Sequence, residues 1–337
     1  MTLLSEVERM RKQFDNQDAK VIKRLVDLYG QGYERIIPEL DAFREFLEIQ
    51  LQTGKLTVKT LRSSAVYKNL IKEVEKELTA YQAILRGEIT TAAEQAARAG
   101  LASGRLLTRQ AIADALGVAV KDLPADVAKL AGNDALAFLA QYLKKDGVLF
   151  DKIDALSKFH AAEISQGIVA QVGIGLGPRD IAKWVTDAYG VGLTDSLRMA
   201  RTVQLYSYRT AQNEVQVANA DLLQGVVWVA VLDDRTCMSC VELHGQIFEV
   251  GTICNDHHNG RCTMAPLVKG ADNPVTQTGQ DWFTSQSEAT QREMMGGAKY
   301  EAWKDGKFTL DDLSVTYKND VFGEMRTEPS LKSLLGE

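Results

Sequence analysis

Cysteine and proline are scarce in this chain, which has four cysteines and six prolines in 337 residues. All four cysteines fall between Cys237 and Cys262, unlike the spread of a disulfide framework through a small secreted fold. Long apolar runs are also missing, so no stretch has the length needed to cross a bilayer. Charge begins at Glu6, where a signal peptide would need an apolar core. These absences predict a protein of a reducing compartment that has no membrane contact and uses its clustered cysteines to bind metal.

An excess of basic charge is lacking too, because 39 lysines and arginines face 45 aspartates and glutamates, for a net charge of −6. Affinity for nucleic-acid phosphates comes mainly from basic side chains that displace counterions. The composition therefore argues against a protein whose main partner is nucleic acid. With 45% apolar residues the chain can build a substantial core, and its length favours two or more domains.

Residues 1 to about 225 read as successive helices. The clearest amphipathic face recurs at spacings of three and four residues: Tyr67, Leu70, Ile71, Val74, Leu78, Tyr81, Ile84 and Leu85. Further helices are expected at 88–103, 108–116, 124–143 and 150–172, and a long one from Thr194 towards Ala220 with Arg198, Arg201 and Arg209 on its surface. The glycines at 173–177 follow a helix, so they predict a helix-to-helix joint before Pro178 rather than a phosphate-binding loop.

The pattern changes at Val226, where an apolar and β-branched run to Leu232 predicts a buried strand. Residues 246–250 are its expected antiparallel partner. Helix returns from Ser285, with Glu288 completing a capping box, and is expected to reach about Trp303. A turn and a short extended piece at 307–310 follow, and the last stretch reads as polar and loosely held.

The cysteines and two histidines form the one cluster with clear chemical meaning. Cys237 and Cys240 make a Cys-x-x-Cys knuckle at the end of the expected strand, and two such thiolates can bind one ion. His257 and Cys262 lie five residues apart in a polar loop and can present an imidazole and a third thiolate to the same ion. These ligand types predict a zinc site. Cys254 and His258 remain open as alternatives to His257, whereas His244 and His160 read as surface or packing residues.

A site of this composition would be closed. Three thiolates and one neutral imidazole fill the four positions of a tetrahedral zinc ion, which leaves no place for a metal-bound water. The sequence thus predicts a structural ion in a protein that is not an enzyme, with no catalytic or cofactor-binding residues and no small-molecule substrate. The centre would carry a net charge near −1, which Arg235 and Arg261, next to ligands, are expected to offset.

The expected fold class is therefore α+β and predominantly α-helical, with a helical N-terminal region followed by a small zinc-stapled α+β domain containing a short β-hairpin. The expected divisions are a helical region at 1–150, a helical connector at 151–225, the zinc-stapled domain at 226–310 and a polar C-terminal tail at 311–337.

The motifs around these ligands resemble the Mu F-type family of phage minor head morphogenesis proteins. That family's signature is similar to Asp-x-Arg-Thr-Cys-x-x-Cys, then Leu-x-Gly-x-x-Phe, then His-Pro-x-Cys-Arg-Cys-Thr. Its counterparts here are 233–240, 243–248 and 257–263. His258 replaces the usual proline and Gly260 the first cysteine of the last element, which points to Cys262 as the required thiolate and to His257 as the signature histidine. The resemblance spans roughly 165–310, with specific motifs only from 233 to 263.

The resemblance implies a structural minor capsid protein of a tailed phage, built into the head in a few copies and associated with the portal vertex. Its implied partners are the portal protein and, beyond it, the major capsid or scaffolding protein, with contact to packaged DNA in some members. The implied location is the virion, and the host cytoplasm during assembly.

The main alternative is an HNH-type metal-dependent nuclease, because a Cys-x-x-Cys followed by Asp256, His257 and His258 looks like its opening. Such an enzyme needs a later histidine or asparagine, on the following helix, for its catalytic metal. No histidine follows His258, and the asparagine available after it, Asn273, lies in a proline-flanked loop. A zinc deaminase needs His-x-Glu and Pro-Cys-x-x-Cys elements that this sequence lacks. A DNA-binding zinc ribbon fits poorly with so few basic residues near the cysteines.

Overall fold

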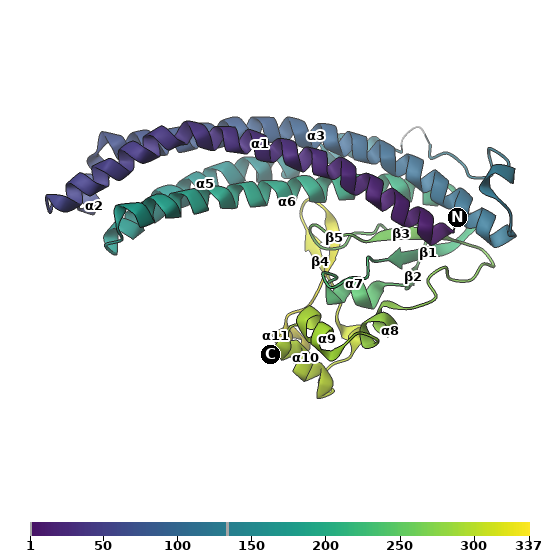
Figure 1. Cartoon of the computed structure of the whole chain (residues 1–337). Helices are drawn as coiled ribbons and strands as arrows, with labels where there is room; N and C mark the ends of the chain where they lie inside the picture. Colours follow the sequence, from purple (N-terminus) through teal and green to yellow (C-terminus); the bar gives the residue numbers. More distant parts are fainter. Residues whose placement is uncertain (1, 133–134) are drawn as a thin grey trace. The chain divides into compact units, whose positions relative to one another are not determined.

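The computed structural model describes residues 2–132 and 135–337, most of which are helical (Figure 1). In chain order its elements are α1 (Leu3–Gln52), α2 (Val58–Ser63), α3 (Ala65–Leu116), η1 (Val120–Asp122), α4 (Ala137–Tyr142), α5 (Val148–Gly173), α6 (Pro178–Ala218), β1 (Leu223–Val229), α7 (Met238–Leu243), β2 (Ile247–Phe248), β3 (Thr263–Val268), α8 (Gly279–Thr284), α9 (Glu288–Met295), α10 (Gly297–Lys304), η2 (Leu310–Asp312), β4 (Val315–Asn319), β5 (Gly323–Thr327) and α11 (Leu331–Leu334). The expected fold class is confirmed: helices dominate and a small α+β region with short antiparallel strands follows them. In the described part of the chain, no helix is both long and apolar enough to cross a membrane.

The chain forms two compact units built from discontinuous segments. The first comprises Met1–Asn16, Ala93–Gln141 and Thr202–Glu337, and the second Gln17–Ala92 and Tyr142–Arg201. Helices α1, α3 and α6 each contribute residues to both units. The domain boundaries expected at 150, 225 and 310 stay a prediction.

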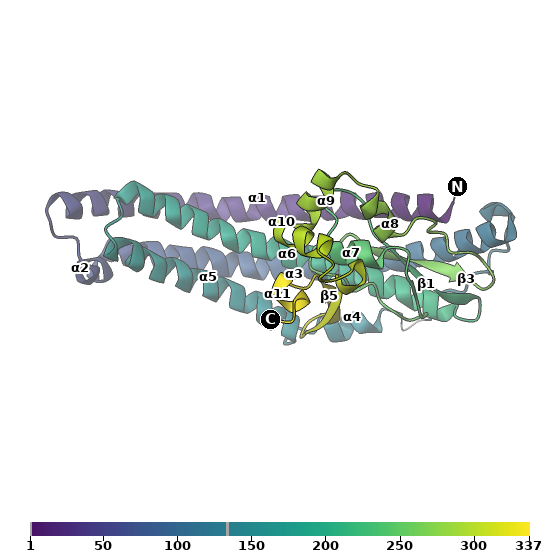
Figure 2. The same ribbon diagram turned by 90° about the horizontal axis from the view of Figure 1, so that it is seen from below.

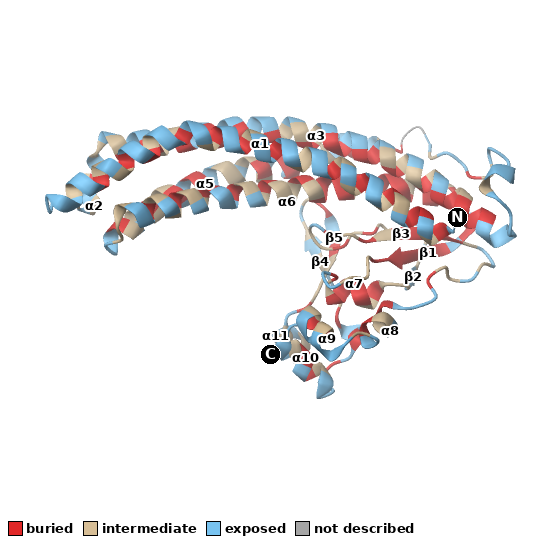
Figure 3. Ribbon diagram, viewed as in Figure 1, coloured by how far each residue is buried: buried red, intermediate tan, exposed pale blue. Residues whose placement is uncertain are grey.

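The second unit is all helical, and its core follows the expected amphipathic face. Buried and exposed stretches alternate along α3 in Figure 3. Six of the eight residues on the expected face are buried: Tyr67, Leu70, Val74, Leu78, Tyr81 and Leu85. The other two are Ile71, which is partly buried, and Ile84, which has 40% of its surface exposed. Aromatic packing completes this core, because the Tyr29 ring lies 4.6 Å from that of Tyr81 and 4.5 Å from that of Tyr189.

The helices are longer than the sequence indicated. The expected joint is confirmed, because α5 ends at Gly173 and α6 begins at Pro178, but α6 then runs through Thr194 without a break. The helix expected at 124–143 is wrong for most of its described length, since only α4 is helical there; residues 133–134 lie outside the described part.

Helix α3 also continues where a break was expected after residue 103. Its glycines do not interrupt it; they bring two helices of the first unit close together. A Cβ added at Gly100 would lie 2.1 Å from the carbonyl oxygen of Tyr208 in α6, and one at Gly104 would lie 3.0 Å from that of Gln212. Glycine here permits close backbone approach, at the modest cost in helix propensity that the residue carries.

A three-stranded sheet of order β2-β1-β3 forms the centre of the first unit, and all its pairs are antiparallel. The strand expected at 226–232 is confirmed as β1, shifted to begin at Leu223, and its expected partner is confirmed as β2. The longer partner, β3, was not expected. Figure 3 shows β1 buried along nearly its whole length, because both of its faces are covered.

The two faces of the sheet have different neighbours. One face, with Val227, Val229 and Ala265, packs on the first turns of α1 and the end of α3. The other, with Val226, Trp228 and Met264, packs on α7 and on the cysteines, of which Cys240, Cys254 and Cys262 are buried and Cys237 is partly buried. The cysteine-rich segment is therefore an integral layer of the sheet's core.

The outer edge of β3 lacks one backbone hydrogen-bond donor, at Pro266. The N–H and C=O of Trp228 bond to Gln246 and Gly245 on the β2 side, so Val227 and Val229 direct their bonds towards β3. Pro266, which lies opposite Val226, therefore turns its nitrogen to the outer edge, where a proline has no N–H to offer.

The C-terminal part is more ordered than expected. Helices α8 to α11 lie next to α7 (Figures 1 and 2), and Phe283, Tyr300 and Phe308 share a core cluster with Met238 and Val241 of α7. The helix expected from Ser285 to Trp303 is two helices that meet at Gly296, whose φ is 82°, and its N-cap is Ser287.

The tail expected to be polar and loosely held instead forms the hairpin β4–β5, with Phe322 and Met325 buried. The N–H of Arg326 donates to the carbonyl of Asn255, and the Asn255 side-chain amide donates to the carbonyls of Phe322 and Glu324. The hairpin is thus fastened to the loop that carries the expected ligands. The piece expected to be extended at 307–310 leads into the 3-10 helix η2.

Candidate metal centre

A hydrogen-bonded turn after β1 sets the position of the Cys-x-x-Cys knuckle. The Thr236 hydroxyl donates to the carbonyl of Val231 and accepts from the N–H of Asp233 at 2.9 Å. The Asp233 carboxylate in turn accepts from the N–H of Arg235 at 3.0 Å. The chain then enters α7 with Cys237 as its N-cap, and the Cys237 sulfur accepts the N–H of Cys240 at 3.4 Å. Both sulfurs are therefore presented from the first turn of one short helix.

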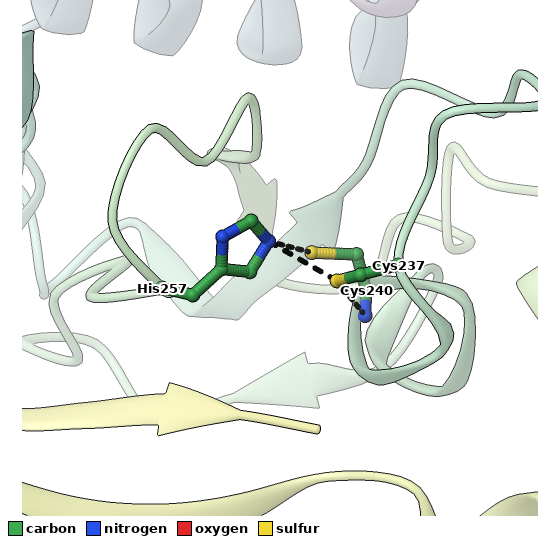
Figure 4. Close-up of side chains that lie close together, drawn as sticks. All are labelled: Cys237, Cys240 and His257. Carbon is green, nitrogen blue, oxygen red and sulfur yellow. Dashed lines mark hydrogen bonds between the residues drawn. The ribbon is translucent and has the colours of Figure 1, made fainter. Parts of the chain in front are cut away.

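His257 points its ring at this knuckle (Figure 4). Its Nε2 lies 3.1 Å from the Cys237 sulfur and 3.6 Å from that of Cys240. Its Nδ1 lies 2.8 Å from the carbonyl oxygen of His258, which accepts a hydrogen bond from it when the proton resides there. This second bond fixes the ring and leaves Nε2 as the ligating atom, the arrangement found for metal-bound histidines.

Cys262 completes the group from the start of β3. Its sulfur lies 3.2 Å from that of Cys240. Two sets of potential ligand atoms lie within 4.8 Å of one another, Cys237 with Cys240 and His257, and Cys240 with Cys262 and Asp256. A tetrahedral zinc ion with ordinary bond lengths would place two sulfurs about 3.8 Å apart and a sulfur and a nitrogen about 3.5 Å apart. The four residues expected from the sequence therefore come together at distances compatible with one such ion.

The two alternative ligands lie elsewhere. Cys254 is buried in the apolar cluster beside Trp228, and it belongs to neither of the two sets found among the described residues. Its burial raises the pKa of its thiol well above the ordinary value. The His258 ring packs edge-on against Phe322, and its Nδ1 lies 3.3 Å from the Thr202 hydroxyl. Geometry thus favours His257 as the nitrogen ligand.

Without an ion the centre behaves as an acid–base pair. Hydrogen bonds from the Cys240 thiol and the His257 ring lower the pKa of the Cys237 thiol to about 5. The bond to Cys237 raises the pKa of His257 to about 10. A thiolate and an imidazolium therefore face each other, and the proton on His257 must leave when a metal binds.

The arginines expected to offset the charge of the centre have other partners. Both guanidinium Nη atoms of Arg261 bond to the Asp233 carboxylate at 2.6 Å, and they hold the pKa of that carboxyl well below its usual range. The Arg235 side chain is 76% exposed and reaches the same carboxylate at 3.4 Å. Both residues support the turn before Cys237, and Arg261 also lies close enough to Cys262 for a thiolate there to stabilise its positive charge.

Two further arginines, which the sequence did not single out for this purpose, lie close to the ligands. Arg209, expected on the helix surface, is buried, and it bonds to Asp256 and to the backbone near Cys262. Arg11 in α1 has its Nε and Nη2 atoms buried without a hydrogen-bond partner, and it lies close enough to Cys262 for a thiolate there to stabilise its buried positive charge. Its distance from the ligands in sequence explains why local spacing gave no sign of it.

His244, read as a packing residue, has a definite task. Its Nδ1 accepts the N–H of Ala230 at 3.0 Å, just where β1 ends. Burial lowers the pKa of the ring to about 4, so the ring is neutral at physiological pH. His160 belongs to the second unit, where it lies 3.3 Å from the carboxylate of Asp195.

The site is thus a knuckle from α7, an imidazole and a sulfur from the following loop, and a shell of hydrogen bonds that orients each of them. Such an arrangement can hold one soft divalent ion with four protein ligands. Beyond this geometry, comparisons with protein-family models, curated proteins and solved structures found no match for the chain.

Proposed function

We propose that this chain is a structural zinc protein in which Cys237, Cys240, His257 and Cys262 hold one ion. The observation that carries the proposal is that soft ligands from the N-terminus of a helix and from the loop before β3 converge on one place. Three sulfurs and an imidazole suit zinc better than calcium or magnesium, which take oxygen ligands. Four protein ligands leave no open position, so the ion would hold structure and not activate water.

We further propose that the protein serves in head assembly of a tailed phage, as a minor capsid protein at the portal vertex. The support is that each signature element has a role in the same small region. Asp233 and Thr236 build the turn before the knuckle. Gly245, with φ of 89°, donates its N–H to Trp228, and the Phe248 ring lies 5.8 Å from that of Trp228. The residues of the signature therefore contact one another or the same strand in the fold, which supports reading them as one motif.

The implied partners follow from the resemblance and are part of this proposal: the portal protein, the major capsid or scaffolding protein, and packaged DNA. The protein would then reside in the virion after assembly in the host cytoplasm. The long helices of the second unit could contact a large partner, and none of the proposed metal ligands belongs to that unit.

Metal content tests the first proposal. Protein purified without added metal should contain about one zinc per chain by elemental analysis, and the Cys240→Ser variant should contain far less. Cys254→Ser is the matched control, because this cysteine is equally buried yet stands outside the ligand sets; it should keep its zinc. Wild-type protein without stoichiometric metal would refute the proposal, and so would equal loss in the two variants.

Assembly tests the second. The protein should co-purify with portal protein from infected cells and be found by mass spectrometry in mature heads. Metal-dependent cleavage of DNA at low protein concentration would favour the nuclease instead. One observation disfavours it: the Asn273 side chain donates to the carbonyl of Gly245 and accepts the N–H of Val275, so it serves its own loop.

A further inference from the structure

Two of the four proposed ligands stand on a segment without regular secondary structure. The loop at 256–262 precedes β3 and carries His257 and Cys262 at its two ends. Its backbone visits the left-handed region at Asn259, where φ is 61°. A polar loop of this kind would move freely unless other groups held it, and a moving loop would make a poor half of a metal site.

A single guanidinium group from α6 holds that loop. Arg209 donates from Nε and Nη2 to the carbonyl of Cys262, at 3.0 and 2.6 Å, and from Nη2 to that of Gly260 at 3.2 Å. Its Nη1 lies 2.5 Å from Oδ1 of Asp256. The two side chains are only 5% and 2% exposed, so these bonds form away from water. All three nitrogens of Arg209 are thereby committed to one loop.

Asp256 closes the loop from the other side. Its Oδ2 accepts the N–H of Cys262 at 3.3 Å while also facing Nη2 of Arg209 at 3.2 Å. The carboxylate occupies the space next to Gly260, where an added Cβ would lie 1.9 Å from Oδ2. Asp256 lies within ligand distance of Cys240 and Cys262, but its oxygens are already engaged in these bonds.

We propose that Arg209 and Asp256 are positioning residues, which fix the 256–262 loop so that His257 and Cys262 meet the knuckle before an ion arrives. This inference rests on the proposed zinc centre and adds the residues that preorganise it. Partners beyond the ligands commonly change metal affinity by about 10–100-fold when they are removed. The pair is electrically neutral as a whole, so its effect comes from geometry.

A simpler role for Arg209 would be that of a positive charge near the thiolates. The two roles make opposite predictions for Asp256→Asn, a change that keeps the side chain's shape. If Arg209 acts as a charge, loss of a neighbouring carboxylate favours a centre of net charge −1 and zinc binds more tightly. If the pair positions the loop, the weakened bonds to Arg209 and Cys262 make zinc bind more weakly.

The experiment compares the full-length wild type with Arg209→Met, Asp256→Asn and the control Arg198→Met, whose arginine lies on the same helix near an aspartate but is half exposed. Zinc affinity is measured by competition with a chromogenic chelator, and Co²⁺ binding by its thiolate charge-transfer band. We expect affinity to fall by about 10–100-fold in the first two variants and to stay unchanged in the control. We also expect the Co²⁺ band to lose about a third of its intensity, as one of three sulfurs leaves the ion.

The possible outcomes distinguish failure of the positioning role from failure of the proposed zinc centre. A wild type that binds no zinc refutes the proposed metal centre. A wild type that binds zinc, with both variants within about twofold of it, refutes the positioning role alone. Tighter binding by Asp256→Asn also refutes it, in favour of a charge effect. If Arg209→Met fails to fold, as judged by circular dichroism, the isosteric Asp256→Asn variant decides the question.

Discussion

Replacing Gly260 with alanine tests how rigidly the 256–262 loop is held. The added Cβ would lie 1.9 Å from Oδ2 of Asp256, 2.1 Å from its Cγ and 2.3 Å from Oδ1, all far inside van der Waals contact. The backbone itself does not forbid alanine, because Gly260 is not among the residues with positive φ. The collision with Asp256 is therefore the main reason for a change in stability.

The loss of stability depends on whether the loop shifts or the Arg209–Asp256 pair separates. A small shift of the loop corresponds to overpacking, which costs about 1–3 kcal/mol. Separation of the buried pair of Arg209 and Asp256 costs about 3–5 kcal/mol, because a charge is left without its partner. Since Arg209 holds Asp256 by two bonds, we expect Gly260→Ala to lower the free energy of unfolding by about 3 kcal/mol, where the two ranges meet.

Urea unfolding of the metal-free protein, followed by tryptophan fluorescence, to which the buried Trp228 contributes, measures this difference. Gly297→Ala is the control, because a Cβ there meets only the end of the Arg292 side chain at 3.8 Å, and we expect it to change stability by less than about 0.5 kcal/mol. In an Asp256→Ala background the space is free, so Gly260→Ala should add little. A Gly260→Ala protein as stable as its control would refute the account of the loop.

Three further outcomes are expected. Arg11→Met should weaken zinc binding about tenfold in chelator competition, because the buried guanidinium of Arg11 offsets the charge of the centre. The control Arg9→Met removes a half-exposed arginine of the same helix and should leave the affinity unchanged; equal affinities of the two variants would contradict this. Burial lowers the pKa of His244 from 6.5 in the unfolded chain to about 4 in the folded protein, so the unfolded chain takes up the proton first and His244 should remove about 3 kcal/mol of stability as the pH falls from 6.5 to 4. In urea titrations of metal-free protein, the wild type should lose more stability than His244→Gln by about this amount, and equal losses would contradict this. Gly167→Ala should lower the melting temperature of the helical unit, since its Cβ would lie 1.9 Å from the Trp184 ring, and an unchanged value would show that the ring moves aside.

The clustering of the four proposed ligands could be predicted from the sequence because their signal is local. Cys237 and Cys240 are fixed by a spacing of three, and a strand before them was visible in the run from Val226. The nitrogen ligand was harder, since His257, His258 and Cys254 have suitable side chains within a few positions. Only the fold shows that His258 packs on Phe322 and Cys254 in the apolar cluster.

The residues that hold the ligands could not be found in this way. Arg209 lies on a helix whose periodicity marks apolar faces, and a buried arginine at that position looks like any solvent-facing one until its partner Asp256 is placed beside it. The same holds for Gly100, whose role in letting α3 and α6 approach each other has no sign in the local sequence. Both cases depend on contacts between segments far apart in the chain, which no local pattern records.

The C-terminal hairpin was missed for a related reason. The segment at 315–327 is polar on its surface and only Phe322 and Met325 enter the core, too few to form an alternating pattern. Its order comes from pairing within the hairpin and from the bonds with Asn255, both of which are invisible without the fold.

The edge of β3 has a consequence for copies of this protein held close together. A strand arriving from a second copy would need donors and acceptors in register along that edge. At this edge the carbonyl of Met264 already accepts a hydrogen bond from the Gln212 side chain, and Pro266 has no backbone N–H to donate. Crowding should therefore not join these sheets into a continuous ribbon along β3, and copies brought together would have to meet through other surfaces.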